Sequence, residues 1–120
     1  MVKQEFPPLP DELKIYRAIL KRTWIDPDTQ EVDANAFILR PKDKETGLST
    51  AFDAIAARKP FNKSFGVVEI QVKDIRDLGL DAIQDEPDHI GIKGIPFDEK
   101  SIKDYAGMLA NKAKVVEKDF

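Results

Sequence analysis

The most regular pattern of apolar positions lies in the last quarter of the chain. From Asp98 onward, apolar residues recur at steps of three and four: Ile102, Tyr105, Ala106, Leu109, Ala113 and Val116. This spacing places them on one face of a helix. Lysines at positions 112, 114 and 118 follow where a helix dipole favours cations. We therefore expect an amphipathic C-terminal helix that continues to about Val116.

Shorter apolar runs in the middle of the chain predict strands. Residues 65–72 carry four β-branched residues and predict the central strand of a sheet. Further short strands are expected at 80–83 and 89–95. One helical turn over 74–78, ended by Gly79, should separate the first two of these strands.

Residues 12–24 carry two overlapping patterns. Leu13, Tyr16 and Leu20 fit a helical stripe, whereas Ile15, Ile19 and Trp24 favour a strand. The segment runs into Asp26-Pro27-Asp28, which is a turn signal, and residues 32–40 then alternate. We interpret the whole as a β-hairpin with a long tip, and a helix over 12–22 stays an open alternative.

The remaining segments complete the expected organisation. Residues 41–47 are a polar loop, after which Ser49 or Thr50 should cap a short helix that ends before Pro60. Its apolar side would be formed by Phe52, Ile55 and Ala56. Residues 1–10 include a Pro-rich run that cannot be helical and predict an extended arm. Residues 11–120 then form a single α+β domain with a mixed or antiparallel sheet, a short central helix and the C-terminal helix.

Composition removes several classes of function. The 120 residues contain no cysteine and one histidine, which excludes thiolate metal sites, a cysteine nucleophile and multi-histidine metal sites. The net charge of −3 argues against nucleic-acid binding, which needs a basic surface. Apolar runs reach only four or five residues, and no signal peptide is visible, so we expect a cytoplasmic protein without membrane contact. The oligomeric state stays open.

Two apparent binding motifs do not meet their chemical requirements. Acidic and amide residues crowd the expected hairpin tip, but an EF-hand loop needs Gly and Glu where this chain has Glu31 and Phe37. We interpret the tip as solvated and expect no metal. The GxxG run at 91–94 falls inside a β pattern, so we expect its glycines to ease a bend in a strand or to line a close contact. No Ser–His–Asp triad follows from the sequence, because all three serines have cap or loop explanations.

Three residues are candidates for chemistry. Arg17 interrupts an apolar run, so it either faces solvent, pairs with an acid, or lies at a pocket floor and binds phosphate or carboxylate. His89 follows Asp85-Glu86-Pro87-Asp88, and neighbouring carboxylates favour its charged form, which suits a general acid. A plain loop hydrogen bond is the alternative for His89. Ser49 adjoins the polar loop.

The order of short motifs resembles a family of small uncharacterised bacterial proteins of cyanobacterial type. These carry a YR…AF…GLS…PxH skeleton, matched here by Tyr16-Arg17, Ala36-Phe37, Gly47-Leu48-Ser49 and Pro87-Asp88-His89. The resemblance covers about Leu9 to Val115 and implies no particular activity.

The chain also resembles ADP-ribosyltransferase-like domains, including RES-type toxins that consume NAD. There, a first strand bears a YR-like pair and a serine-led motif precedes a helix. The resemblance implies that Arg17 holds a cofactor phosphate, that Ser49-Thr50 is the serine motif, and that Glu86 or His89 fills a third site.

By elimination, we expect a small soluble binding or accessory module without catalysis or cofactor, which engages a protein partner or a small-molecule ligand. The alternative is an NAD-binding ADP-ribosyltransferase-like domain, active or degenerate. That alternative requires Arg17, Ser49 and His89 to meet in one cleft, and it fails if Arg17 and His89 lie on opposite faces.

Overall fold

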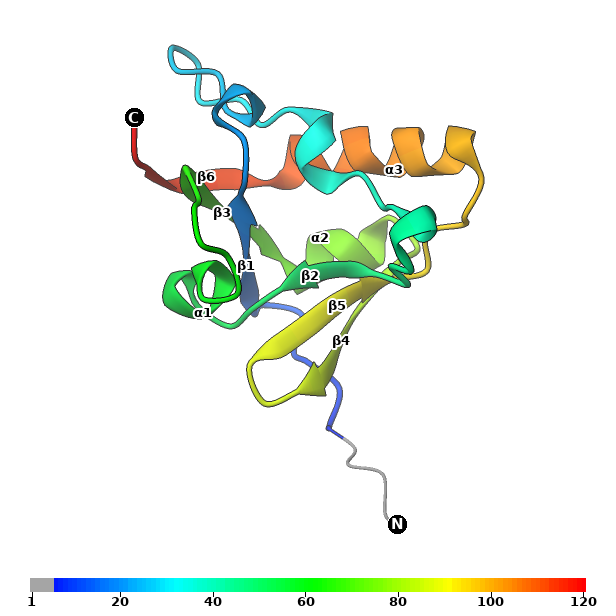
Figure 1. The fold of residues 1–120 in the computed structure, drawn as a ribbon. Helices are drawn as coiled ribbons and strands as arrows, with labels where there is room; N and C mark the ends of the chain where they lie inside the picture. Colours follow the sequence, from blue (N-terminus) through cyan, green and yellow to red (C-terminus); the bar gives the residue numbers. More distant parts are fainter. Residues whose placement is uncertain (1–5) are drawn as a thin grey trace.

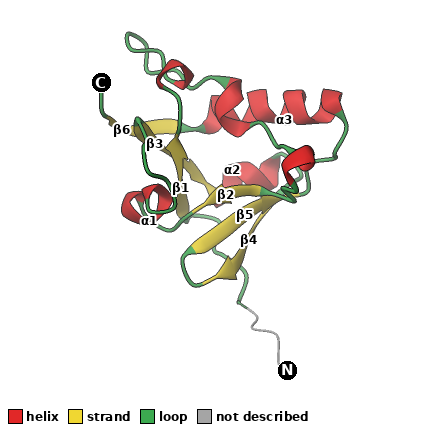
Figure 2. Ribbon diagram, in the orientation of Figure 1, coloured by secondary structure: helices red, strands yellow, loops and turns green. Residues whose placement is uncertain are grey.

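Two three-stranded antiparallel sheets and three α-helices make up the computed structural model, which describes residues 6–120 (Figures 1 and 2). The first sheet has the order β1-β3-β6, from β1 (Lys14–Ile19), β3 (Gly66–Gln71) and β6 (Lys114–Lys118). The second has the order β2-β5-β4, from β2 (Leu48–Thr50), β5 (His89–Lys93) and β4 (Asp81–Glu86). The helices are α1 (Ala54–Arg58), α2 (Val72–Asp77) and α3 (Glu99–Lys112). This arrangement confirms the α+β class with antiparallel sheets.

The two sheets are joined where β1 passes β2. Tyr16 and Ala51 exchange both main-chain hydrogen bonds, at N–O distances of 2.9 and 2.8 Å. On its other side β1 pairs with β3 over its whole length, from Lys14–Gln71 to Ile19–Gly66. The core lies between the sheets and α3, and Phe37, Ile15, Ile19 and Leu109 are among its fully buried side chains. Strand β1 therefore lies at the centre of the molecule (Figure 1).

Residues 14–19 form a strand, but the hairpin predicted with residues 32–40 is wrong. The second half of that hairpin is a 3-10 helix, η2 (Ala34–Phe37), and the two segments share only the single bridge Ile25–Val32. Asp33 caps η2 by accepting a hydrogen bond from the Asn35 N–H at 2.8 Å. The apolar alternation of 32–40 reflects burial of a tight helical turn beside α3. The Asp26 turn is confirmed, since its carboxylate accepts from the N–H groups of Asp28 and Thr29.

The cap predicted for the short central helix is also wrong. Ser49 and Thr50 belong to strand β2, and Asp53 itself caps α1 by accepting from the Ala56 N–H at 2.7 Å. Consequently the helix turns a different face inward: Ala57 is buried, whereas Ile55 is 82% exposed. The helix ends at Arg58, before Pro60, as expected.

The C-terminal helix begins as predicted and ends earlier. Asp98 caps α3 through the Ser101 N–H, but the helix ends at Lys112 and Ala113 is extended. Residues 114–118, including Val116, instead form β6, which pairs with β3. Pairing with β6 supplies main-chain hydrogen bonds to the edge of β3 that β1 leaves open. These tertiary hydrogen bonds outweigh the preference for helix that the spacing of the sequence indicates.

The other expectations for the middle of the chain are confirmed. Strand β3 is central in its sheet, α2 is followed by Gly79 at a φ of 83°, and β4 and β5 form a hairpin that contains Gly91. Two further 3-10 turns, η1 (Arg22–Trp24) and η3 (Pro41–Asp43), lie in connections. Of the predicted arm, residues 1–5 lie outside the described residues, and 6–10 form neither helix nor strand. Within residues 6–120, no helix is both long and apolar enough to cross a membrane.

Candidate functional site

A cleft of about 520 Å³ lies where the two sheets meet beside α1, and it contains all three candidate residues, Arg17, Ser49 and His89. This volume is in the range of small-molecule sites. The walls come from β1, β2, α1, the connections on either side of them, and the β4–β5 hairpin. The lining residues are Tyr16, Arg17, Ala18, Leu20, Trp24, Arg40, Glu45, Ser49, Thr50, Ala51, Ala56, Ala57, Lys59, Pro60, Phe61, Glu86, Asp88 and His89.

Arg17 has the parity of a core residue. In β1 it lies two residues from Ile15 and two from Ile19, and both isoleucines are fully buried. Because residues two apart in a strand share a face, the Arg17 side chain leaves β1 on the core-facing side. Nε donates a hydrogen bond to the main-chain oxygen of Ala36 at 2.7 Å, and Nη1 donates to that of Ser49 at 2.8 Å. The guanidinium lies over the Phe37 ring, with its carbon 5.6 Å from the ring centroid. These contacts fix the guanidinium at the junction of the sheets.

The charge of Arg17 has no contacting counter-charge. Burial lowers the pKa of Arg17 to about 10; Glu45 partly opposes this shift and Arg40 adds to it. Among residues 6–120, no carboxylate lies within 4.0 Å of the guanidinium, and Nη2 makes no hydrogen bond to the protein. The Arg17 side chain is half-buried, and Nη2 is not among the buried atoms without a partner, so solvent reaches it from the cleft. A guanidinium whose fixed protein partners are neutral carbonyls favours an anion at that position.

Ser49 and His89 meet across neighbouring strands. Ser49 is opposite Gly91 in the β2–β5 register, and His89 lies two residues from Gly91 on the same face of β5. Ser49 and His89 are therefore diagonal neighbours on the two strands, and His89 Nε2 lies 3.1 Å from Ser49 Oγ. The backbone of the sheet thus brings together two residues that are forty positions apart.

Asp85 completes a chain of three hydrogen-bonded side chains. The β4–β5 register shifts between Gln84 and Glu86, so Asp85 lies in an irregularity of the ladder. Such irregularities redirect side chains. Here Asp85 Oδ1 lies 2.5 Å from His89 Nδ1, on the side of the ring opposite Ser49. The His89 and Asp85 side chains are 35% and 42% exposed, so the chain lies at the mouth of the cleft.

Sequence reasoning found Arg17, Ser49 and His89 but missed Asp85. The signal that could have indicated Asp85 is the acidic run before His89. This run contains three carboxylates, and the sequence does not show which of them contacts the histidine. The choice depends on the irregular β4–β5 register. The other serines lie elsewhere: Ser64 Oγ accepts a hydrogen bond from Arg58, and Ser101 lies in the first turn of α3.

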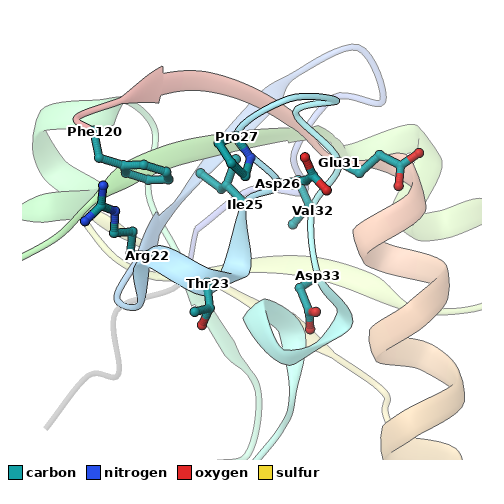
Figure 3. A pocket seen from close by; sticks show the side chains of 9 residues that line it. All are labelled: Arg22, Thr23, Ile25, Asp26, Pro27, Glu31, Val32, Asp33 and Phe120. Carbon is teal, nitrogen blue, oxygen red and sulfur yellow. The ribbon is translucent and has the colours of Figure 1, made fainter.

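A second cavity, of about 610 Å³, contains none of these residues (Figure 3). Phe120 and Arg22 lie together at one side of it, with the guanidinium carbon 5.1 Å from the ring centroid. Two of its three acids already have structural partners: main-chain N–H groups hydrogen-bond Asp26 and lower its pKa, and Asp33 caps η2. The third acid, Glu31, is exposed. The part of the chain that the structure describes has no group of three acids or histidine suited to a metal. The smaller cleft is therefore the candidate site.

Comparisons of the chain with protein-family models, curated proteins and solved structures gave no match. Both resemblances drawn from the short motifs therefore stay predictions.

Proposed function

We propose that the protein is a small-molecule binding module whose cleft holds an organic anion, a carboxylate or a phosphate, against Arg17. The observation that carries this proposal is the placement of Arg17: it lies on the core-facing side of β1, it is half-buried at the cleft, and no carboxylate within residues 6–120 contacts it. A bound anion would supply the missing counter-charge through a charge-assisted hydrogen bond to Nη2.

The rest of the cleft suits an organic ligand rather than a bare inorganic ion. Tyr16, Trp24 and Phe61 provide aromatic surface, and Ala56 and Ala57 of α1 leave space beside them. The walls carry charges of both signs, Arg40 and Lys59 on one hand and the carboxylates of Glu45, Glu86 and Asp88 on the other, so the anionic group is placed by Arg17 and not by a positive charge of the whole cleft. An aromatic or aliphatic acid, or a phosphate monoester, would place its anionic group at Arg17 and its apolar part against these rings.

The competing interpretation is that Arg17 only ties β1 to η2 and β2 through its two carbonyl contacts. A titration of ¹⁵N-labelled protein with benzoate, benzamide and phenyl phosphate separates the two. The anions should give saturable amide shifts around Arg17 and Ser49, and the neutral, isosteric benzamide should not. Arg17→Lys, which loses the planar guanidinium, should weaken the anions' binding at least tenfold.

The matched control is Arg22→Lys, since Arg22 lies outside the cleft and lines the second cavity. It should bind like the parent. Equal shifts with benzoate and benzamide, or anion binding that Arg17→Lys leaves unchanged, would refute the anion site.

An NAD-binding ADP-ribosyltransferase-like domain is the second candidate function. One observation favours it: Arg17, Ser49 and His89 line one cleft, and Glu86, the alternative third residue, lines it too. Under this proposal Arg17 holds a phosphate of NAD. Release of nicotinamide on incubation with NAD, lost in Glu86→Gln or His89→Ala, would support it, and intact NAD with no chemical-shift change would exclude it. A cytoplasmic location and a protein partner stay predictions.

A further inference from the structure

We propose that Ser49 is a nucleophile activated by His89 and positioned by Asp85, and that the cleft hydrolyses an activated carboxylic ester or thioester. This inference rests on the proposed function in one respect: the Arg17 anion site is also where the negative charge of the reaction develops. The activation of Ser49 is argued separately, from the hydrogen bonds of the three side chains.

The hydrogen bonds give each ring nitrogen of His89 a defined role. A carboxylate is an acceptor only, so Nδ1, 2.5 Å from Asp85 Oδ1, carries the proton. In the neutral ring Nε2 then presents its lone pair to Ser49 Oγ, 3.1 Å away. This is the arrangement in which an imidazole removes a proton from a hydroxyl. His89 is the general base and Asp85 a positioning residue that fixes the tautomer.

Arg17 places positive charge beside the nucleophile. Its Nη1 donates a hydrogen bond to the main-chain oxygen of Ser49, so the guanidinium is held against the same residue that carries Oγ. Its Nη2 has no protein hydrogen bond within residues 6–120 and is free to donate to an oxyanion. Fixed donors where charge develops are usually the largest contribution to catalysis of acyl transfer.

The proposed reaction has two balanced halves. Ser49 Oγ bonds to the carbonyl carbon of the ester while its proton passes to Nε2, and the carbonyl oxygen becomes the oxyanion beside Arg17. The bond from carbon to the leaving oxygen or sulfur then breaks, and Nε2 gives the leaving group the proton. Water next attacks the acyl-serine, loses a proton to Nε2, and releases the acid while Ser49 recovers its proton.

The aromatic wall of the cleft indicates the substrate class. Tyr16, Trp24 and Phe61 offer apolar surface beside Ser49, so an aryl or medium-length alkyl acyl group fits better than a charged one. The opposite interpretation is that the serine–histidine contact is an unreactive surface hydrogen bond of the β2–β5 pair.

Covalent labelling separates reactivity from mere hydrogen bonding. An alkyl fluorophosphonate phosphonylates an activated serine: the Oγ–P bond forms, fluoride leaves, and the proton passes to the base. The chain has three serines and no cysteine, so intact mass followed by peptide mapping assigns one adduct without competition from thiols. We expect a single adduct on Ser49, none in Ser49→Ala, and at least hundredfold slower labelling in His89→Gln. Ser101→Ala, on α3 outside the cleft, should label like the parent.

Asp85→Asn tests the positioning role by a spectroscopic signature. His89 is the only histidine in the chain, so its two ring nitrogens give unambiguous ¹⁵N signals. The parent should show the Nδ1–H tautomer. Asp85→Asn offers an amide N–H₂ to Nδ1, which should shift the population toward the Nε2–H tautomer and slow labelling of Ser49. A merely structural Asp85 would leave the tautomer unchanged.

Two measurements keep this inference distinct from the proposed function. No adduct on Ser49, or an adduct whose rate is unaffected by His89→Gln, overturns the nucleophile whatever the anions do. Absence of saturable benzoate shifts overturns the anion site whatever the probe does. Turnover of p-nitrophenyl butyrate by the parent, lost in Ser49→Ala and at least tenfold slower in Arg17→Lys, would support both.

Discussion

Removing the charge of Arg17 while keeping its aliphatic length should barely change stability and should abolish ligand-induced stabilisation. Arg17→Met makes this change. The pKa of Arg17, about 10, is more than two units below the ordinary value of a solvated arginine, because burial disfavours the charged form. One pKa unit is worth about 1.4 kcal/mol, so folding holds this charge at a cost of at most about 3.5 kcal/mol.

The hydrogen bonds of Arg17 offset that cost. Its two contacts to main-chain carbonyls are charge-assisted and contribute about 1.5 kcal/mol each. Arg17→Met removes both the free-energy cost of burying the charge and the stabilisation from the two hydrogen bonds, and these two terms nearly cancel. We expect the free energy of unfolding of the variant to lie within about 1 kcal/mol of that of the parent, a shift of roughly 4 °C in Tm for a domain of this size.

Ligand then separates the two proteins. An anion that binds only the native state at one hundred times its Kd stabilises the parent by about 2.7 kcal/mol, or roughly 10 °C. Thermal unfolding of both proteins with and without phenyl phosphate measures this difference. Arg17→Met should show no ligand-dependent rise. A variant that loses more than about 3 kcal/mol without ligand, or keeps the full rise, would refute the assignment of Arg17 as an unpaired anion site.

The remaining predictions concern the framework that holds the cleft. Gly66→Ala should destabilise the protein by about 1–3 kcal/mol in urea unfolding, because a Cβ at Gly66 would lie 2.4 Å from the main-chain oxygen of Glu117 in β6. Gly107→Ala on α3 is the control: its Cβ meets nothing within 4 Å, so it should stabilise by about 0.5–1 kcal/mol, and a loss there would contradict the packing described. Hydrogen bonds from Arg58 lower the pKa of Asp119, so this pair stabilises the fold above the unfolded-state pKa of aspartate, about 4, and its contribution is lost as the pH falls through the lower folded value. Asp119→Asn should therefore reduce the fall in stability on acidification below about pH 4, and an unchanged acid profile would refute this.

Local signals in the sequence predicted the elements that depend on local chemistry. The β-branched run of β3, the helical spacing that begins at Asp98 and the glycine after α2 each act within a few residues, and each is found in the structure. The predictions that failed depended on partners far along the chain. Residues 114–118 continue a helical spacing but pair with β3, and residues 32–40 alternate like a strand but form η2 against α3.

The candidate site divides in the same way. Arg17 was found because a charge within an apolar run is unusual, and His89 because it is the only histidine. That Ser49 would contact His89 depends on the β2–β5 register. The choice of Asp85 over its acidic neighbours depends on an irregularity in the β4–β5 ladder. A sequence carries no direct signal for either register.

The central claim is that the fixed guanidinium of Arg17 binds an organic anion in the cleft. A crystal structure of the protein with phenyl phosphate tests this claim most directly. The account predicts the phosphate within hydrogen-bonding distance of Arg17 Nη2, the phenyl ring against Tyr16 or Phe61, and the two carbonyl contacts of Arg17 retained. A guanidinium paired instead with Glu45 or another carboxylate of the chain, with the cleft free of ligand, would contradict it.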